Sequence, residues 1–285
     1  MIQSMTGYGK TELQLPTKKV TIEIKSLNSK NLDLNVRTPS YYKEKELDVR
    51  KKIAKSLTRG KIDFSIYVES IGQNLSSEIN ASALKSYMNQ LKEVSDAPDV
   101  ELLKMAIGLP ETMQTSREKL DEGEWELINN AIDEALVKIN IYRADEGAVL
   151  KDDFKKRLTI IGDRLDDVIE IDPQRMENVR ERLRKSVVDL KAKVDENRFE
   201  QELMFYLEKL DITEEKVRLQ NHLNYFLEEL NSDTSNGKKL GFISQEIGRE
   251  INTIGSKANF AEMQKLVVQM KDELEKIKEQ NLNVL

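Results

Sequence analysis

Hydrophobic and polar residues alternate in three segments of the first seventy positions. These segments are residues 20–25, 32–36 and 62–68, and in each the apolar side chains fall on every second position. A period of two places them on one face of a β-strand. The turn-like residues 28–31 predict that the first two segments form a hairpin. Between the second and third segments, apolar residues at helical spacing predict a Lys-rich helix that ends at Gly60.

The first nine residues predict a further strand, in which Gly7 and Gly9 permit a bulge or a close approach of another backbone. Residues 1–70 therefore predict a small, mostly antiparallel sheet covered by one helix. Their net charge is +6, whereas the rest of the chain carries −12 and the whole chain −6. This asymmetry suits a surface that faces a polyanion. A small domain that is simply Lys-rich explains the same numbers.

Beyond a loop at residues 72–77, the spacing of apolar residues becomes helical along most of the chain. Short helices are predicted at 83–94 and 100–107. Residues 122–171 contain no proline, and one continuous helix there would be about 75 Å long at 1.5 Å per residue. Because that length exceeds the diameter of a globular domain, we expect an extended arm or a break near Gly147.

Two further positions carry helix start signals. Asp172 and Pro173 predict a stop and restart, with Asp as the N-cap and Pro in the first turn of the next helix. Thr213 predicts the N-cap of a later helix. The fold class is therefore α+β, a small sheet domain followed by a long all-α region with extended arms and a C-terminal helical hairpin. The predicted regions are an N-terminal α+β domain at 1–75, a helical arm region at 76–200 and a C-terminal helical domain at 201–285.

The last fifty residues carry two helical patterns that predict a hairpin. In the second of them, apolar residues from Phe260 to Ile277 alternate spacings of three and four, which is a coiled-coil seam. This seam suits a contact between subunits or packing within one chain. Gly255 is expected to cap the first helix. Isoleucines at spacings of four, four and three mark one face of that first helix: Ile243, Ile247, Ile251 and Ile254.

The polar face of this isoleucine helix departs from an ordinary surface. Gln245, Arg249 and Asn252 form one row, and Glu246 and Glu250 lie one turn apart on another flank. Surface helices usually carry interchangeable Lys and Glu, whereas amide and guanidinium groups form directional hydrogen bonds. The row therefore predicts a binding surface, and the alternative is a polar face that is merely solvated.

A neighbouring helix carries the single histidine, His222. Because the loop at 231–236 is short, this helix is expected to lie antiparallel to the isoleucine helix. His222 can then meet Glu246 and Glu250. The alternative is a structural histidine that pairs with a core or surface carboxylate. Steps of four, three and four place a polar set on one face of the helix: Asp211, Glu215, Arg218 and His222.

Two signatures resemble the YicC family, one at each end of the chain. QEIGREINTIGSK, followed by KDELEKIKEQ, is similar to the C-terminal family form LDFLxQEMNRExNTIxSK, and SMTGYGK resembles the N-terminal form SMTGFGR. EEKVRLQNH, EIKSLNSKNLD, the Arg59-Gly60-Lys61 segment and RADEGA are similar to internal family segments. The resemblance spans the chain. It implies a bacterial, metal-dependent endoribonuclease that works as a ring-like homo-oligomer, a hexamer.

RNA cleavage needs a base, stabilisation of the phosphorane charge and an acid for the leaving oxygen. A single His excludes a two-histidine mechanism within one subunit, and the lack of Cys excludes a thiolate zinc site. Carboxylates clustered with a histidine suit Mg²⁺ or Mn²⁺. We expect catalytic roles for His222, Glu246 and Glu250, and Asp211 is the weakest metal candidate. The predicted metal ligands are Glu215, His222, Glu246 and Glu250.

Basic and amide side chains are the candidates for holding RNA phosphates. Arg59 and Lys61 flank a glycine, although cations there can equally offset the dipole of a preceding helix. This chain departs from the family form at two motif positions, where Gly241 replaces an Asp and Gly248 replaces an Asn. If either missing residue binds or positions a ligand, activity is reduced. The candidate phosphate ligands are Lys30, Arg59, Lys61, Arg218, Arg249, Asn252 and Lys257.

The sequence has no apolar run of eighteen residues and no signal-peptide pattern at its start. We therefore expect no membrane partner and a cytoplasmic location, with RNA rather than DNA as the ligand. Two rival functions remain open. One is a non-catalytic RNA-binding adaptor that presents RNA to other nucleases, and the other is a purely structural helical assembly factor.

Overall fold

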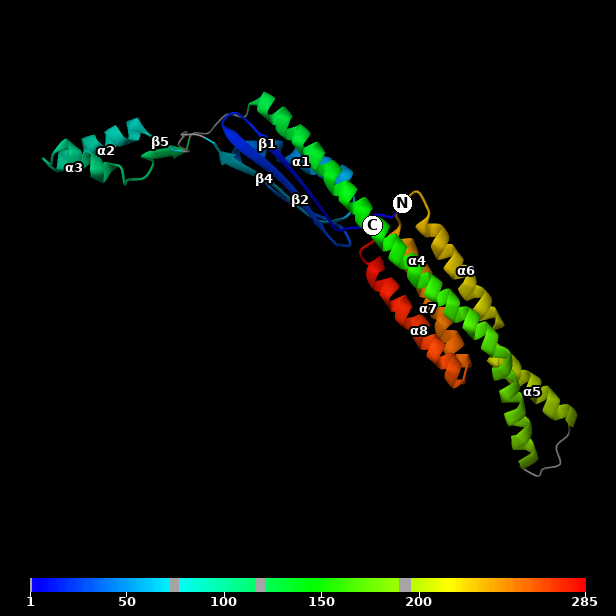
Figure 1. Cartoon of the computed structure of the whole chain (residues 1–285). Helices are drawn as coiled ribbons and strands as arrows, with labels where there is room; N and C mark the ends of the chain where they lie inside the picture. The colour runs from blue at the N-terminus through cyan, green and yellow to red at the C-terminus, as the bar shows by residue number, and fades with distance from the viewer. Residues whose placement is uncertain (1, 72–76, 116–120, 190–195) are drawn as a thin grey trace.

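The computed structural model describes residues 2–71, 77–115, 121–189 and 196–285. The molecule is long and narrow, and one helix runs past two separate hydrophobic cores (Figure 1). Among the described helices, none is long and apolar enough to cross a membrane.

The N-terminal unit is a four-stranded sheet with the strand order β1-β2-β4-β3. Strand β2 pairs antiparallel with both β1 and β4, whereas β3 pairs parallel with β4. The predicted sheet, mostly antiparallel, is therefore confirmed. The strands are β1 (Gly7–Gln14), β2 (Lys18–Leu27), β3 (Leu32–Arg37) and β4 (Gly60–Ser70).

The predicted hairpin between the second and third strands is wrong. Both edges of β2 are occupied, one by β1 and the other by β4, so the turn-like residues 28–31 lead away from β2. From β3 the chain returns through the 3-10 helix η1 (Ser40–Lys45) and helix α1 (Glu46–Ser56). A crossover of this kind joins parallel strands, which explains the pairing of β3 with β4.

The apolar face of the sheet packs against two helices rather than the single one predicted. Buried residues of β2 share a core with Ile53 of α1 and with Ile139 of α4. Helix α4 crosses β1 so closely that a Cβ added at Gly9 would lie 2.3 Å from the carbonyl oxygen of Ala135. The close approach predicted for this glycine is confirmed.

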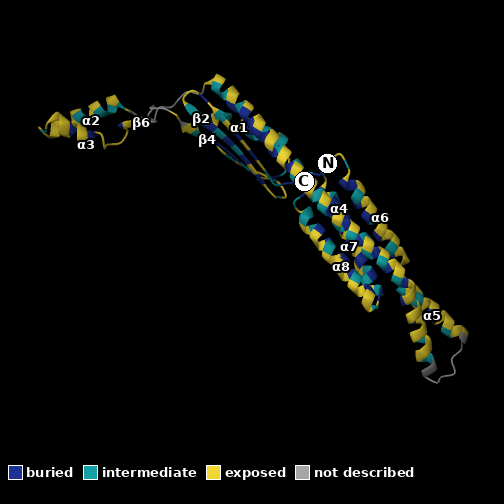
Figure 2. Cartoon of the chain, viewed as in Figure 1, coloured by how far each residue is buried: buried dark blue, intermediate teal, exposed yellow. Residues whose placement is uncertain are grey.

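Helix α4 (Glu122–Asp189) has 68 residues and connects the two cores (Figures 1 and 2). At 1.5 Å per residue it is about 100 Å long, which confirms an extended arm. The alternative of a break near Gly147 is wrong. A Cβ at Gly147 would lie 2.2 Å from the carbonyl oxygen of Ile2, so this glycine admits the N-terminal segment and the helix continues.

The helix stop predicted at Asp172 and Pro173 is also wrong, because Pro173 lies inside α4. The Asp172 carboxylate does not cap a helix. It accepts hydrogen bonds from Arg175 Nε at 2.8 Å and from Lys216 Nζ at 2.7 Å. Arg175 is fully buried and also donates to the carbonyl oxygen of Leu210 at 3.0 Å. Proline normally breaks a helix, but here tertiary contacts keep α4 continuous around it. The local sequence pattern gives no information about those contacts.

The C-terminal core forms where α4 packs against α6 and α8, and α7 packs against the same two helices. Helix α5 lies against the distal part of α4 (Figure 1). Helix α7 continues through Gly255 to Lys257, so the predicted cap at Gly255 is wrong. Thr213 is the first residue of α6, and Asp211 Oδ1 accepts from its backbone nitrogen at 3.1 Å. The helices are α5 (Glu196–Leu210), α6 (Thr213–Leu230), α7 (Gly237–Lys257) and α8 (Ala261–Asn281).

A small unit lies beyond the far end of the sheet (Figure 1). Its two helices confirm those predicted at 83–94 and 100–107, and its two short strands pair antiparallel. Near the middle of α4 the two ends of the chain meet, where Ser4 forms a β-bridge with Val284. The elements of the small unit are β5 (Ser77–Ile79), α2 (Ala81–Val94), α3 (Asp99–Ala106) and β6 (Met113–Thr115).

Candidate active site on helices α6 and α7

Helices α6 and α7 meet along a polar line that we call the α6–α7 seam. At one end Lys257 Nζ donates to Glu215 Oε1 at 2.8 Å, and at the other Lys239 Nζ donates to Glu229 Oε2 at 2.5 Å. Both glutamates are buried. The hydrogen bond with Glu229 raises the pKa of Lys239. Two ion pairs therefore fix the register of the antiparallel helices.

The spacing along each helix explains why this line is polar. Seven residues make nearly two turns, so Glu215, His222 and Glu229 share one stripe of α6. On α7, steps of seven and eleven place Glu246 and Glu250 on the stripe that begins and ends with the paired lysines. The α6–α7 seam consists of Glu215, His222 and Glu229 on α6, and of Lys239, Glu246, Glu250 and Lys257 on α7.

His222 lies at the middle of the seam. On α6, His222 is midway between Glu215 and Glu229. On α7, Gly248 is midway between their partners Lys257 and Lys239. His222 and Gly248 are therefore at the same level along the two helices. Glu246 and Glu250 are within one turn of that level. The antiparallel placement expected from the short loop is therefore confirmed. The described residues hold no cluster of three such side chains, so the meeting of His222 with both carboxylates stays a prediction.

The middle of the seam differs from its ends in how its groups are paired. Glu250 is only 5% exposed, yet it has no hydrogen bond or ion pair with any residue that the structure describes. His222 is half-buried and likewise has no such partner in the described ranges. Glu246 is more exposed and pairs with Arg249 Nη1 at 3.0 Å. The carboxylate oxygens of Glu250 are not among the buried atoms that lack a partner, so the group reaches the surface of the seam and is open to a ligand.

The four predicted metal ligands are not gathered into one cluster. Within the described residues, no three His, Asp or Glu side chains are close enough together to hold a metal ion. Glu215 is two turns away from His222 and is paired with Lys257, although its Oε2 atom is buried without a partner. Asp211 stands at the start of α6, where the hydrogen bond from the Thr213 hydroxyl lowers its pKa.

The predicted phosphate ligands fall into two groups. On the helical bundle, Arg218 is exposed on α6 and pairs with Glu214 at 2.5 Å, while Asn252 is exposed on α7. The second group lies on the sheet, where Arg59 Nε donates to the carbonyl oxygen of Ser29 at 3.0 Å. Helix α1 ends before Arg59, so this contact joins two loops. We call this second group the basic turn, which comprises Lys30, Arg59 and Lys61.

A buried arginine on α4 positions the basic turn, and its role was not predicted. Arg143 is 2% exposed and donates to Ser26 Oγ at 2.5 Å and to the carbonyl oxygen of Arg59 at 3.2 Å. Burial lowers the pKa of Arg143 to about 10, so the group stays charged at neutral pH. Next to it, Gly60 has a φ of +121°, a conformation that favours glycine. The RADEGA segment was the only sequence signal for this contact.

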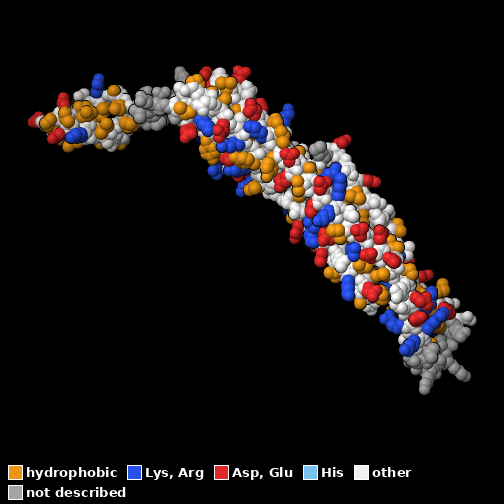
Figure 3. Space-filling view, viewed as in Figure 1, with side chains coloured by type: hydrophobic (Ala, Val, Ile, Leu, Met, Phe, Trp, Pro, Cys, Tyr) orange, Lys and Arg blue, Asp and Glu red, His pale blue; other side chains and the backbone are white. Residues whose placement is uncertain are grey.

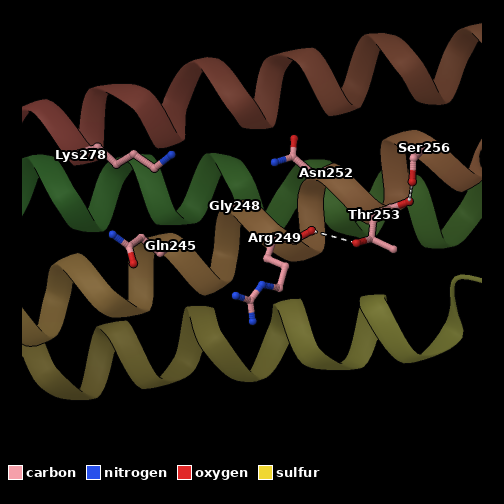
Figure 4. A pocket seen from close by; sticks show the side chains of 7 residues that line it. All are labelled: Gln245, Gly248, Arg249, Asn252, Thr253, Ser256 and Lys278. Atoms are coloured by element: carbon pink, nitrogen blue, oxygen red, sulfur yellow. Dashed lines mark hydrogen bonds between the residues drawn. The ribbon is translucent and has the colours of Figure 1, made fainter.

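The outer face of α7 and one residue of α8 line a groove of about 540 Å³ (Figure 4). The predicted polar row lies in it, which confirms that these side chains share one surface. Figure 4 shows that Lys278 reaches it from α8. The α7–α8 groove is lined by Gln245, Gly248, Arg249, Asn252, Thr253, Ser256 and Lys278.

Comparison with known proteins identifies the class to which this fold and these motifs belong. Residues 2–152 match the family model described as "Endoribonuclease YicC-like, N-terminal region", and residues 168–285 match "Endoribonuclease YicC-like, C-terminal". The chain therefore belongs to the YicC-like endoribonuclease family. This result confirms the resemblance at both ends of the sequence.

Two relatives match over their full length. The "Probable endoribonuclease YicC" of Clostridioides difficile (strain 630) is 31% identical over 293 residues, with both chains fully covered. The protein with the same name from Haemophilus influenzae is 30% identical over 289 residues, again with full coverage of both chains.

Proposed function

We propose that this protein is a cytoplasmic endoribonuclease, a hydrolase that cleaves RNA phosphodiester bonds with the help of Mn²⁺ or Mg²⁺. Its membership of the YicC-like family along the whole chain supports this activity, as do the names of its full-length relatives. The observation that carries the proposal is the middle of the α6–α7 seam, where His222 lies level with Glu250, a largely buried residue whose accessible carboxylate has no ion-pair partner among the described residues.

The chemistry of these groups suits phosphodiester cleavage. His222 can transfer a proton to or from a reacting oxygen, the role that an imidazole most often has in general acid–base catalysis. Arg249 and Arg218 lie nearby on exposed helix faces and can offset charge that develops on the phosphorane. Each is held by a surface ion pair with a glutamate, which an RNA phosphate can replace.

The donor set fits a divalent cation only in part. Glu250 and His222 have free donor atoms, whereas Glu215 and Glu246 are engaged with Lys257 and Arg249. Mg²⁺ is commonly held by one or two carboxylates together with waters and substrate phosphates. Glu250 and His222 would therefore hold the ion jointly with RNA. When bound, the ion would neutralise phosphate charge and make bound water more acidic.

We also propose that the protein works as a homo-oligomer, a hexamer. One chain does not assemble three metal-ligating side chains among its described residues, so a second subunit can complete the site. The small unit at residues 77–115 supports the same proposal. It buries only a few residues and exposes apolar side chains such as Val94, Val100 and Met105, and a unit of that size rarely builds an adequate core by itself.

The test is cleavage of an end-labelled RNA hairpin by the purified protein with Mn²⁺, with Mg²⁺ or with EDTA. We expect internal cuts that require the metal. Glu250→Gln and His222→Ala should each reduce the rate by about 10²–10⁴-fold, the usual contribution of a positioned proton-transfer group. The matched controls are Glu228→Gln and Asn221→Ala, which change exposed neighbours on α6 and should cleave as the wild type does.

Other outcomes would contradict the proposal in specific ways. Cleavage that persists in EDTA would exclude the metal requirement. RNA that stays intact but shifts in a native gel would favour the RNA-binding adaptor. The pairing of Glu215 and Glu246 with basic side chains is the observation that keeps this second function open.

A further inference from the structure

The α7–α8 groove is built for a polyanion, although only part of it was predicted. Its lining includes Arg249 and Lys278 and contains no carboxylate. The side-chain amides of Gln245 and Asn252 have no hydrogen-bond partner among the described residues, so their N–H groups are available. Arg249 and Asn252 point in different directions from α7, toward α6 and α8 respectively (Figure 4).

Lys278 is the cation on the α8 side of this groove. Its ammonium pairs with Glu275 at 2.7 Å, and the two side chains are 38% and 65% exposed. An ion pair that is so exposed contributes little, because water screens it. A phosphate entering the groove can therefore take the ammonium from Glu275 without leaving a buried charge behind.

Gly248 keeps the floor of the groove open beneath Lys278. A Cβ added there would lie 3.6 Å from Lys278 Nζ and 3.1 Å from Leu274 Cδ2. The family form carries an asparagine at this position, whose amide would occupy that space. Because Gly248 has no side chain in place of that asparagine, the Lys278 ammonium is the polar group nearest to the floor of the groove.

The groove is connected to the basic turn of the sheet unit. Asn28, in the loop before Lys30, donates through Nδ2 to the carbonyl oxygen of Leu282 at 2.6 Å. Lys278 precedes Leu282 by four residues, or about 6 Å along the helix axis. Lys278 therefore stands between the basic turn and the groove. Lys and Arg side chains gather on the surface where the sheet unit meets the helical bundle (Figure 3).

We propose that Lys278 binds an RNA backbone phosphate and joins the basic turn to the α7–α8 groove in one track. The track would lead the strand along the outer face of α7 to the α6–α7 seam. This inference rests on the proposed function, because it takes RNA as the polyanion. It adds Lys278 and Gln245 to the residues that contact RNA, and neither belongs to the predicted set.

The test measures RNA affinity apart from cleavage. A labelled, unstructured RNA is titrated with the protein in EDTA at several KCl concentrations, and the dissociation constant is taken from fluorescence anisotropy. Lys278→Met should weaken binding about 3–10-fold and lower the slope of log K against log salt by about 0.7, the value for one lost phosphate contact on a single strand. Gln245→Glu adds a negative charge to an exposed position and should also weaken binding.

The control is Lys265→Met, which removes the same charge from an exposed part of α8 outside the groove and should bind within twofold of the wild type. Wild-type affinity and salt slope in both groove variants would overturn the track while leaving the nuclease in place. A wild type that binds RNA but never cuts it would overturn the nuclease and leave the track. A wild type that binds no RNA would overturn both.

Discussion

The two edges of α7 differ in charge, burial and packing. Against α6, the helix buries carboxylates and holds the register through two ion pairs, Glu215–Lys257 and Glu229–Lys239. Against α8, the groove is open, and its charged lining residues are cations. Glycines recur every seven residues on this second edge: Gly241, Gly248 and Gly255.

The difference shows how one amphipathic helix can serve two kinds of ligand. Residues seven or eleven positions apart lie on the same edge of a helix. One regular helix can therefore carry its acidic residues on one edge and its basic residues on the other. The acidic edge suits a cation, and the basic edge suits the phosphates of a polyanion. If this division is correct, substitutions on the two edges should affect different steps.

The largest expected effect separates cleavage from binding. At saturating RNA, Glu250→Gln should lower the cleavage rate by about 100-fold or more, while its RNA affinity stays within about threefold of the wild type. Lys278→Met should show its larger loss in affinity rather than in rate. Single-turnover kinetics beside anisotropy titrations give both quantities. Equal losses of rate and affinity in both variants would show that the two edges act as one site.

The next effect concerns the stability of the buried edge. Glu215→Gln removes the charge that pairs with the Lys257 ammonium, in a seam where Glu215 is buried and Lys257 is 32% exposed. The ammonium keeps its hydrogen bond to the carbonyl oxygen of Asp211. Because that exposure allows partial hydration, we expect a loss of about 1–3 kcal/mol in the free energy of unfolding, below the range for a fully buried pair. Urea denaturation followed by circular dichroism measures it.

The control for this substitution is Glu214→Gln, which breaks the exposed pair with Arg218. An exposed pair of this kind contributes about 0–1 kcal/mol, so the control should change stability by less than Glu215→Gln does. If the two variants lose the same amount, the seam pair is no stronger than a surface pair, and the contrast between the edges weakens.

Local signals in the sequence were sufficient for much of the fold. Alternation located β2, β3 and β4, and the isoleucine spacing located the buried face of α7. The short loop was sufficient to predict that α6 and α7 lie antiparallel. These predictions succeeded because each depends on contacts between residues that are close in sequence or joined by a short connection.

Several errors came from contacts between distant segments. The pairing of β3 depends on β4 filling the second edge of β2. The continuity of α4 at Pro173 depends on Arg175 and Lys216, which hold Asp172 from two different helices. Arg143 makes its contacts with residues that are far away in sequence. Periodicity carries no information about such partners, so these features could not be predicted from it.

A smaller effect concerns the end of the seam, where α6 begins. Asp211 Oδ1 accepts from the backbone nitrogen and the hydroxyl of Thr213 at 3.1 and 2.7 Å. Asp211→Ala should therefore cost about 1 kcal/mol, the usual net contribution of such hydrogen bonds. Because the Thr213 hydrogen bond lowers the pKa of Asp211 below 3.8, this contribution is present above that pH and is lost as the pH falls through the lowered value.

Thermal unfolding of the wild type and Asp211→Ala at pH 7 and in steps down to pH 3 measures this dependence. The difference between the two proteins should shrink as the pH falls below about 4. A difference that stays constant over the whole range would show that the hydrogen bonds from Thr213 do not depend on the charge of the Asp211 carboxylate.

The smallest effect tests how tightly α7 and α8 pack at the groove. Alanine is favoured over glycine inside a helix by about 1 kcal/mol, but at Gly248 its Cβ would lie 3.1 Å from Leu274 Cδ2 and displace it slightly. We expect Gly248→Ala to raise stability by only about 0–0.5 kcal/mol.

Gly162→Ala on α4 is the matched control, because its Cβ meets nothing within 4 Å, and it should gain about 0.5–1 kcal/mol. Differential scanning calorimetry compares them. A clear loss in Gly248→Ala would show a rigid contact between α7 and α8, so that the groove edge is packed as firmly as the seam.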